Sequence, residues 1–290
     1  MESTKAIEMI EFFDDHWYKI SLTTPEDPDK TVDIYIPSVT TKLNIIAKPF
    51  LARWRGDVGN READMRVFEA CERGVRIHSA WNTLSTGGAV LYNPVKRINY
   101  SLDQIDEIAT EYAGNIEIVR YQDEMMDVWK LQKWVEIVKP KMVASELPVY
   151  SLAHMDAGTA DNIMDIEAGK YQVNGATALE LPAGRYVIDL KSGKQVDDNA
   201  FMQTAAYAKC IEEMGRGEIT GSLILHTGAS TKKGIEGLAT LYRTKEEMQE
   251  DYENYRLAAS LWERKNKDAK PKTFVFPSIL SLKKEIENVA

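Results

Sequence analysis

The order of predicted elements in this 290-residue chain favours an α/β or α+β core over about residues 140–260, preceded by a helical extension. Helical spacing of apolar residues dominates up to Pro140, and a period-two alternation begins directly after it. A helix then interrupts the strands, and a charged helix follows them. We therefore divide the chain into residues 1–140, with a hairpin and a helical region, and residues 141–290, with the core.

The chain begins with a predicted hairpin and an interrupted helix. WYKISL (17–22) and VDIYIP (32–37) have the composition of strands and flank the turn-rich TPEDPDK. Thr40 or Thr41 can cap a helix through LNIIAKPFLARW, because a threonine hydroxyl accepts from a free amide of the first turn. Pro49 kinks or restarts that helix, since proline has no amide proton to donate.

Three more helices are predicted before the core. The first runs from about Arg61 to Leu84, and the others cover 102–113 and 121–138. Apolar residues recur at helical spacing in the first of them, at Met65, Phe68, Ala70, Ile77 and Trp81.

The core is predicted as strands with one helix between them and one after them. The strands are VASELPVYSLA (143–153), GTADNIMDIEA (158–168), RYVIDLKSG (185–193), GSLILHTG (221–228) and GLATLYR (237–243). A helix over 199–214 follows the third strand, and a charged helix over 245–267 closes the core. This alternation is typical of a sheet covered by helices.

The composition indicates a soluble cytoplasmic protein. Hydrophobic residues make up 44% of the chain and charged residues 28%, and no apolar run approaches the roughly 18 residues of a membrane span. The acidic N-terminal segment lacks a basic stretch followed by an apolar one, so we expect no signal peptide. Cys71 and Cys210 are too few for a cysteine-ligated cluster, and both are expected to be reduced core residues.

The charge distribution is uneven. The net charge of −9 does not favour nucleic-acid binding, which needs lysine and arginine for phosphate contacts. Residues 48–78 nevertheless hold seven Lys and Arg against five acids, whereas residues 100–127 hold one arginine against eight acids. A local basic surface is therefore compatible with the overall acidity.

Asp189 and Lys191 in VIDLKSG are the first candidate site residues. Residues i and i+2 of a strand point to the same face, so the carboxylate and the ammonium are neighbours. The apolar residues before Asp189 place it at the end of a buried strand, where an ionised carboxylate is costly without a cation. Lys191 is either a simple salt-bridge partner or a group that stabilises charge or positions a water.

Asp161 in GTAD turns this pair into a candidate metal site. Gly158 permits close packing there, and adjacent antiparallel strands can bring Asp161 within a few Å of Asp189. Two such carboxylates need a metal ion or a proton between them. Hard oxygen ligands favour Mg2+ or Mn2+, and such a site can activate water for phosphodiester hydrolysis.

Gln203 and Tyr207 share one face of the helix that follows Asp189 and Lys191. They can hydrogen-bond to Lys191, to a metal-bound water or to a phosphate; the simpler interpretation is an exposed glutamine beside a core tyrosine. His78, on the long helix, is either a satisfied structural histidine or a further metal ligand. Glu146 can be at the metal site or form a cross-strand surface pair, and we favour the surface pair.

Taken together, these residues resemble the PD-(D/E)XK nuclease superfamily, specifically its RecB-type exonuclease branch. The match covers roughly residues 70–260: RGVRIH corresponds to the first motif with its histidine, GTAD to G-x-x-D, IDLKSGK to D-x-K, and QTAAY to Q-x-x-x-Y. IPSVTTKLNIIAKPFLARW is similar to the opening of phage-type members. The chain departs from some relatives in lacking iron–sulfur cysteines, and it has no Walker-type motor motif.

The resemblance implies a restriction-endonuclease-like core, in which a mixed sheet is flanked by helices. It implies that His78, Asp161, Asp189 and the backbone carbonyl of Leu190 hold Mg2+ or Mn2+. The catalytic set it implies is Asp161, Asp189, Lys191, Gln203 and Tyr207.

The expected function is a metal-dependent deoxyribonuclease on linear double- or single-stranded DNA. We expect an exonuclease of recombination, repair or end processing that works with a recombination protein. A structure-specific endonuclease, a non-catalytic nucleic-acid-binding or partner module of the same fold, and a hydrolase of another phosphodiester remain the alternatives.

Overall fold

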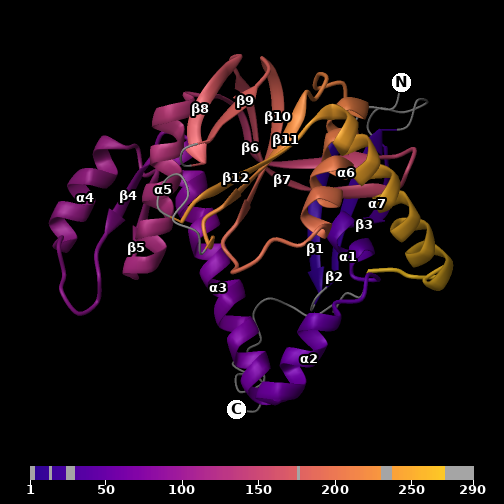
Figure 1. Cartoon of the computed structure of the whole chain (residues 1–290), viewed down its shortest axis with the longest axis horizontal. Coiled ribbons are helices and arrows are strands. Elements are labelled where there is room, and N and C mark those ends of the chain that lie inside the picture. The colour runs from indigo at the N-terminus through magenta and orange to yellow at the C-terminus, as the bar shows by residue number, and fades with distance from the viewer. Residues whose placement is uncertain (1–3, 13–14, 24–29, 175–176, 230–236, 272–290) are drawn as a thin grey trace, which may run out of the picture.

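The computed structural model describes residues 4–12, 15–23, 30–174, 177–229 and 237–271. Its central sheet consists of β6 (Lys141–Ser151), β7 (Asp156–Ile166), β10 (Gly184–Lys191), β11 (Gly221–His226) and β12 (Ala239–Arg243). The strand order is β12-β11-β10-β7-β6, with β10 and β11 parallel and the other neighbours antiparallel (Figure 1). A mixed sheet flanked by helices, as predicted, is therefore confirmed.

Helices cover both faces of this sheet because successive strand residues point to opposite sides. In β10, Val187 packs into one core and Ile188 into the other. The first core lies against α1 (Val39–Leu43), α6 (Asn199–Glu213) and α7 (Lys245–Lys265), and the second against α3 (Asn60–Ser85) and α5 (Gln122–Val138). No helix in the described part of the chain is long and apolar enough to cross a membrane.

The predicted hairpin is present as part of a three-stranded sheet. β2 (Asp15–Thr23) pairs antiparallel with β3 (Thr31–Pro37). A strand that was not predicted, β1 (Thr4–Phe12), adds to the other edge of β2. The turn residues 24–29 lie outside the described part of the chain.

The interrupted helix begins earlier than predicted. Its cap is Ser38, whose side chain accepts a 3.0 Å hydrogen bond from the amide of Thr41. Thr40 and Thr41 are therefore not the cap, because the extended backbone that a cap requires occurs at Ser38. The helix ends at Leu43, and α2 (Pro49–Val58) starts again at the proline, which confirms the predicted restart.

Four short strands outside the predicted pattern form two small sheets. β4 (Ala89–Tyr92) and β5 (Ile116–Val119) pair in parallel, with α4 (Leu102–Glu111) between them in the chain. β8 (Gly169–Asn174) and β9 (Thr177–Leu181) pair antiparallel. Strands of four to six residues are too short to establish a clear alternation in the sequence.

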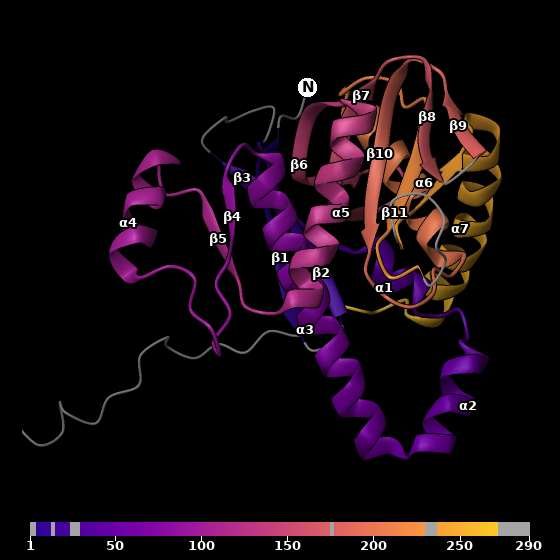
Figure 2. The same ribbon diagram turned by 60° about the vertical axis from the view of Figure 1, so that its left-hand side comes forward.

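α2 and the first half of α3 project from the body as a helical arm (Figure 1, Figure 2). Met65 is 50% exposed and Phe68 66% exposed, although both recur at helical spacing. Cys71 is exposed too, so the expectation that it lies in the core is wrong, whereas Cys210 is buried as predicted. The reason is that this part of α3 extends beyond the sheet, and among the described residues mainly α2 lies against it.

The acidic and basic segments of the sequence meet between α5 and α3. Arg73 Nε lies 2.9 Å from Asp123 Oδ2, and Arg73 also contacts Asp127. Arg76 Nη2 lies 2.6 Å from the buried carboxylate of Glu124. Part of the acidic segment therefore anchors the helix that carries His78.

A buried ion network ties α1 and α7 to β7. Lys42 Nζ lies 2.7 Å from Asp156 Oδ1 and 2.8 Å from Glu263 Oε1. Tyr255 donates its hydroxyl proton to Asp156 Oδ1 at 2.6 Å, and Arg256 donates to Asp156 Oδ2 at 3.2 Å. Because each charge has an opposite charge and further hydrogen bonds, these elements are held in one arrangement.

Candidate metal centre and active site

The two predicted carboxylates lie on neighbouring strands at one end of the sheet. β7 and β10 run antiparallel with Ile188 opposite Asn162, so Asp189 and Asp161 occupy the next position of the ladder. Asp161 Oδ2 accepts a hydrogen bond of 2.8 Å from the backbone amide of Leu190. The strand pairing therefore brings the two acids together.

Asp161 belongs to a cluster of three potential metal ligands from three elements. His78 comes from α3 and Glu146 from β6, and one ligand atom of each residue lies within 4.8 Å of the others. His78 Nδ1 is 3.4 Å from Asp161 Oδ2, and His78 Nε2 is 3.1 Å from the carbonyl oxygen of Leu190. The backbone carbonyl implied as a further ligand thus lies beside this cluster.

Glu146 reaches the cluster from an unusual backbone conformation. Its φ of +48° lies in the left-handed region, which a residue other than glycine rarely adopts within a strand. Desolvation raises the pKa of Glu146, and the nearby carboxylate of Asp161 raises it further. Glu146 is exposed, as the favoured interpretation expected, but its carboxylate lies beside His78 and Asp161 rather than in a cross-strand pair.

Asp189, Lys191, Gln203 and Tyr207 form a continuous chain of hydrogen bonds. Lys191 Nζ donates to Asp189 Oδ1 at 3.0 Å and to Gln203 Oε1 at 3.2 Å. Gln203 Nε2 donates to the hydroxyl oxygen of Tyr207 at 3.2 Å. The ammonium of Lys191 is therefore held between the carboxylate of Asp189 on β10 and the side-chain amide of Gln203 on α6. Neither a simple salt bridge nor an exposed glutamine beside a core tyrosine accounts for this whole series of hydrogen bonds.

The carboxyl group of Asp189 is buried and incompletely satisfied. Burial raises its pKa to about 6, the ammonium of Lys191 opposes this rise, and the carboxylate of Asp161 adds to it. Oδ2 lies 2.8 Å from Lys191 Nζ but makes no hydrogen bond within the described part of the chain. The Lys191 ammonium already lies against this oxygen, and a bound cation would supply a second positive partner for it.

Gly158 of the G-x-x-D sequence and Tyr207 of the Q-x-x-x-Y sequence pack directly against each other. A β-carbon added at Gly158 would lie 2.2 Å from Cε1 of the Tyr207 ring. Tyr207 is 4% exposed and packs over this glycine. The absence of a side chain on β7 therefore makes room for the tyrosine that ends the hydrogen-bonded chain.

The donor set fits a hard divalent cation. The carboxylates of Glu146 and Asp161 and the carbonyl of Leu190 supply oxygen, and His78 supplies one imidazole nitrogen. Ligands about 2.1 Å from one Mg2+ or Mn2+ ion are at most about 4.2 Å apart, which is close to the observed spread. Oxygen donors suit Mg2+ and Mn2+, and the imidazole favours Mn2+ of the two.

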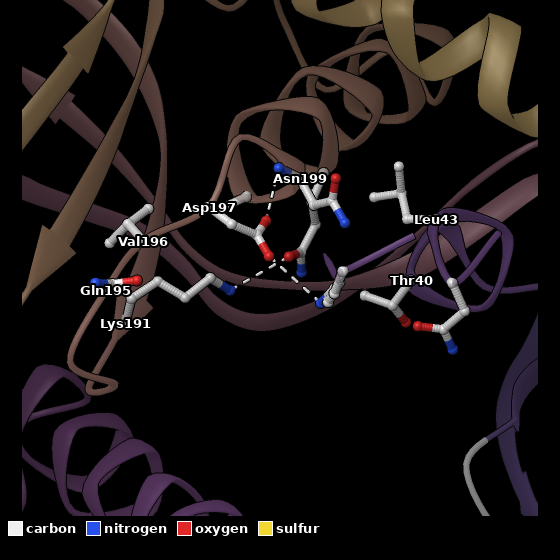
Figure 3. Close-up of a pocket in the computed structure, with 11 residues that line it drawn as sticks. Thr40, Leu43, Lys191, Gln195, Val196, Asp197 and Asn199 are labelled. Atoms are coloured by element: carbon white, nitrogen blue, oxygen red, sulfur yellow. Dashed lines mark hydrogen bonds and ion pairs between the residues drawn. The ribbon is translucent and has the colours of Figure 1, made fainter. Parts of the chain in front are cut away.

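A cavity of about 210 Å³ opens beside Lys191, where the end of α1 faces the start of α6 (Figure 3). Lys191 enters it from one side, and Thr40 and Leu43 lie opposite. Lys48 also lines this cavity, and its Nζ lies 3.4 Å from Asp197 Oδ2. The cavity gives a substrate group direct access to Lys191.

A polar network behind the cluster joins its three elements. Asn162, next to Asp161, accepts from the indole nitrogen of Trp81 and donates to Ser145 Oγ at 2.9 Å. Ser145, next to Glu146, donates to Asn82 Oδ1 at 2.7 Å. Trp81 and Asn82 lie on α3, one turn beyond His78. Trp81 was expected only as part of the apolar face of its helix, and no sequence pattern indicated the three polar partners, because such residues are common in strands and helices.

We expect Asn162→Leu to weaken Mn2+ binding by about tenfold, because loss of a group that orients metal ligands typically has this effect. It should also lower the free energy of unfolding by about 1–3 kcal/mol, since the indole and the serine lose a buried partner. Calorimetric titration with Mn2+ and urea unfolding measure the two effects. Tyr255→Phe is the matched control: it removes a buried hydrogen bond on the α7 side and should leave Mn2+ binding unchanged. Equal affinity in both variants would contradict the positioning role.

All the side chains predicted for the site lie at this end of the sheet, in two adjoining groups. His78 and Asp161 are in the metal cluster with Glu146, whereas Asp189, Lys191, Gln203 and Tyr207 form the hydrogen-bonded chain. Asp189 is not one of the three clustered ligands, although its ladder position adjoins Asp161. No protein-family model matches the chain, and no curated protein matches it.

Proposed function

We propose that this protein is a divalent-metal-dependent nuclease that hydrolyses phosphodiester bonds of DNA. The observation that carries the proposal is the position of the His78, Glu146 and Asp161 cluster beside the Asp189–Lys191 pair. Ligands for a hard cation and a held ammonium at one point are what hydrolysis of an anionic phosphodiester requires. The predicted resemblance to RecB-type nucleases supports the same conclusion.

In this proposal the protein groups have separate tasks. His78, Glu146, Asp161 and the carbonyl of Leu190 would hold Mg2+ or Mn2+, and the carboxylate of Asp189, at the ladder position beside Asp161, would add a further oxygen. Such an ion lowers the pKa of a bound water and polarises a phosphate oxygen. The protein's own contribution is to fix these ligands on four packed elements, α3, β6, β7 and β10.

Lys191 acts as a fixed positive charge in this proposal. Burial lowers the pKa of Lys191, but the carboxylates of Asp189 and Asp161 raise it by more, so it lies above its usual value. The side chain is therefore an ammonium at neutral pH and cannot serve as a general base. It faces the cavity in Figure 3, where it would neutralise a phosphate, while Gln203 and Tyr207 keep it in place.

We expect the purified chain to digest end-labelled linear DNA with Mn2+ or Mg2+ and to lose this activity in EDTA. An exonuclease of recombination or end processing should degrade the linear form and leave a covalently closed circle of the same sequence intact. Gel analysis of both substrates over a time course provides the measurement. Cleavage of the circle would indicate an endonuclease instead. No cleavage of single- or double-stranded DNA with either metal would reject the nuclease proposal.

A further inference from the structure

The helical arm, residues 49–72, carries large apolar side chains that are mostly exposed to solvent. Phe50 is 70% exposed and Phe68 66% exposed. No residue of α2 is buried. Solvent-exposed aromatic rings on a projecting element mark an interaction surface, since exposing them alone is unfavourable.

The polypeptide enters and leaves the arm beside the candidate site. Before α2, Lys48 lines the cavity that contains Lys191 and pairs with Asp197, in the segment between β10 and α6. On α3, Arg73 Nη1 donates a 3.2 Å hydrogen bond to the carbonyl of Ser192 in the same segment. His78 follows about one turn further along this helix. The arm therefore projects from the body next to the segments that carry the candidate site, as the position of α2 and α3 in Figure 1 and Figure 2 shows.

The net positive charge of the arm favours binding of a polyanion, but few of its basic groups are free to contact phosphates. Residues 48–78 have a net charge of +2 in a chain of net −9. Most of these basic groups are neutralised locally, for example Arg55 by Asp64 and Arg66 by Glu62. Two exposed arginines, at positions 53 and 61, have no ion pair within the described residues. So few free cations are too little for strong binding of a duplex through its phosphates alone.

We propose that the arm binds an unpaired nucleic-acid strand and leads it to the metal cluster. Bases stack on Phe50 and Phe68, and Arg53 and Arg61 contact the phosphates. An unpaired strand fits better than a duplex, because its base faces are free to stack on aromatic rings whereas those of a duplex are covered. The inference rests on the proposed nuclease function and specifies the form in which that site receives its substrate.

The test measures binding of fluorescein-labelled dT20 by anisotropy in EDTA, where no cleavage occurs. Wild-type protein should bind dT20 more tightly than a blunt hairpin duplex of the same total length. Phe50→Ala/Phe68→Ala should weaken dT20 binding about tenfold or more, since each stacked base contributes substantially. Arg53→Ala/Arg61→Ala should reduce the slope of log affinity against log salt by about 1.4, at about 0.7 for each phosphate contact. Leu257→Ala, which removes a 72% exposed side chain on α7, is the control and should bind as wild type.

Unchanged dT20 binding by the double phenylalanine variant would overturn the inference. Equal loss of dT20 and hairpin binding would overturn it as well, because the arm would then contact the duplex. Circular dichroism and thermal unfolding of each variant confirm that the fold is retained. Binding without metal is separate from cleavage: arm-dependent binding by a chain that never cleaves DNA would support this inference and reject the nuclease. Metal-dependent cleavage together with arm-independent binding would support the nuclease proposal and reject this inference.

Discussion

Replacing Asp189 with alanine is expected to remove metal-dependent DNA cleavage while leaving the fold intact. The change takes away the buried carboxylate beside Asp161 and releases Lys191 from its partner. We expect a loss of about a thousandfold or more, because charge stabilisation in such a site contributes several kcal/mol and each 1.36 kcal/mol is a factor of ten. The free energy of unfolding should fall only modestly, because burial raises the pKa of Asp189 and makes its ionised form costly, whereas the Lys191 ammonium loses a partner.

The measurement is cleavage of labelled linear DNA under single-turnover conditions with Mn2+. Asp189→Asn is the companion variant, because it keeps the volume of the side chain and removes only the charge. Asp103→Ala, an exposed acid on α4, is the matched control and should cleave as wild type. Circular dichroism establishes that all three remain folded. Undiminished cleavage by either Asp189 variant would refute the site assignment.

Gly158→Ala is expected to destabilise the protein and to impair cleavage together. The new methyl group would lie 2.2 Å from the Tyr207 ring, which is fully packed and cannot simply rotate into solvent. Overpacking of this kind costs about 1–3 kcal/mol or somewhat more, which corresponds to a drop in melting temperature of several degrees. Displacement of Tyr207 also removes the support of Gln203, which holds Lys191.

Two further variants separate packing from chemistry. Tyr207→Ala combined with Gly158→Ala should be more stable than the sum of the single effects predicts, by about 1 kcal/mol or more, because the clash is gone. Its cleavage should stay low, since the hydroxyl is absent. Gly74→Ala is the control, because a methyl group there would meet Ser192 Oγ only at 3.6 Å and helical alanine is favourable. Additive effects of Gly158→Ala and Tyr207→Ala on urea unfolding would show that the two do not interact.

Local patterns were sufficient to predict the elements that carry the site. The period-two runs placed Asp161 and Asp189 on strands, and the actual β7 and β10 differ from the predicted ranges only by a few residues at their ends. The predicted 199–214 helix is α6, with Gln203 and Tyr207 on one face. Such features are readable because side-chain direction follows from strand and helix periodicity alone.

Contacts between distant segments could not be predicted in the same way. For Glu146 the sequence favoured a cross-strand surface pair over the metal site; the residue is exposed, and its left-handed backbone and the pairing of β6 with β7 place it beside Asp161. Met65 and Phe68 fit a helical stripe, yet they are exposed because that part of α3 extends beyond the central sheet. Hydrophobic periodicity indicates which residues share a face of a helix or strand, but not which other element packs against that face.

The sequence by itself determined the strands and helices, the order of the candidate motifs and the chemical character of the side chains they supply. Only the tertiary structure decided that Glu146 rather than Asp189 lies in the three-ligand cluster. It also decided that a glycine on β7 makes room for Tyr207, and that the arm stands free beside the site. The physical reason is that these outcomes depend on which surfaces pack together across long chain separations, and packing selects among faces that the local pattern leaves equivalent.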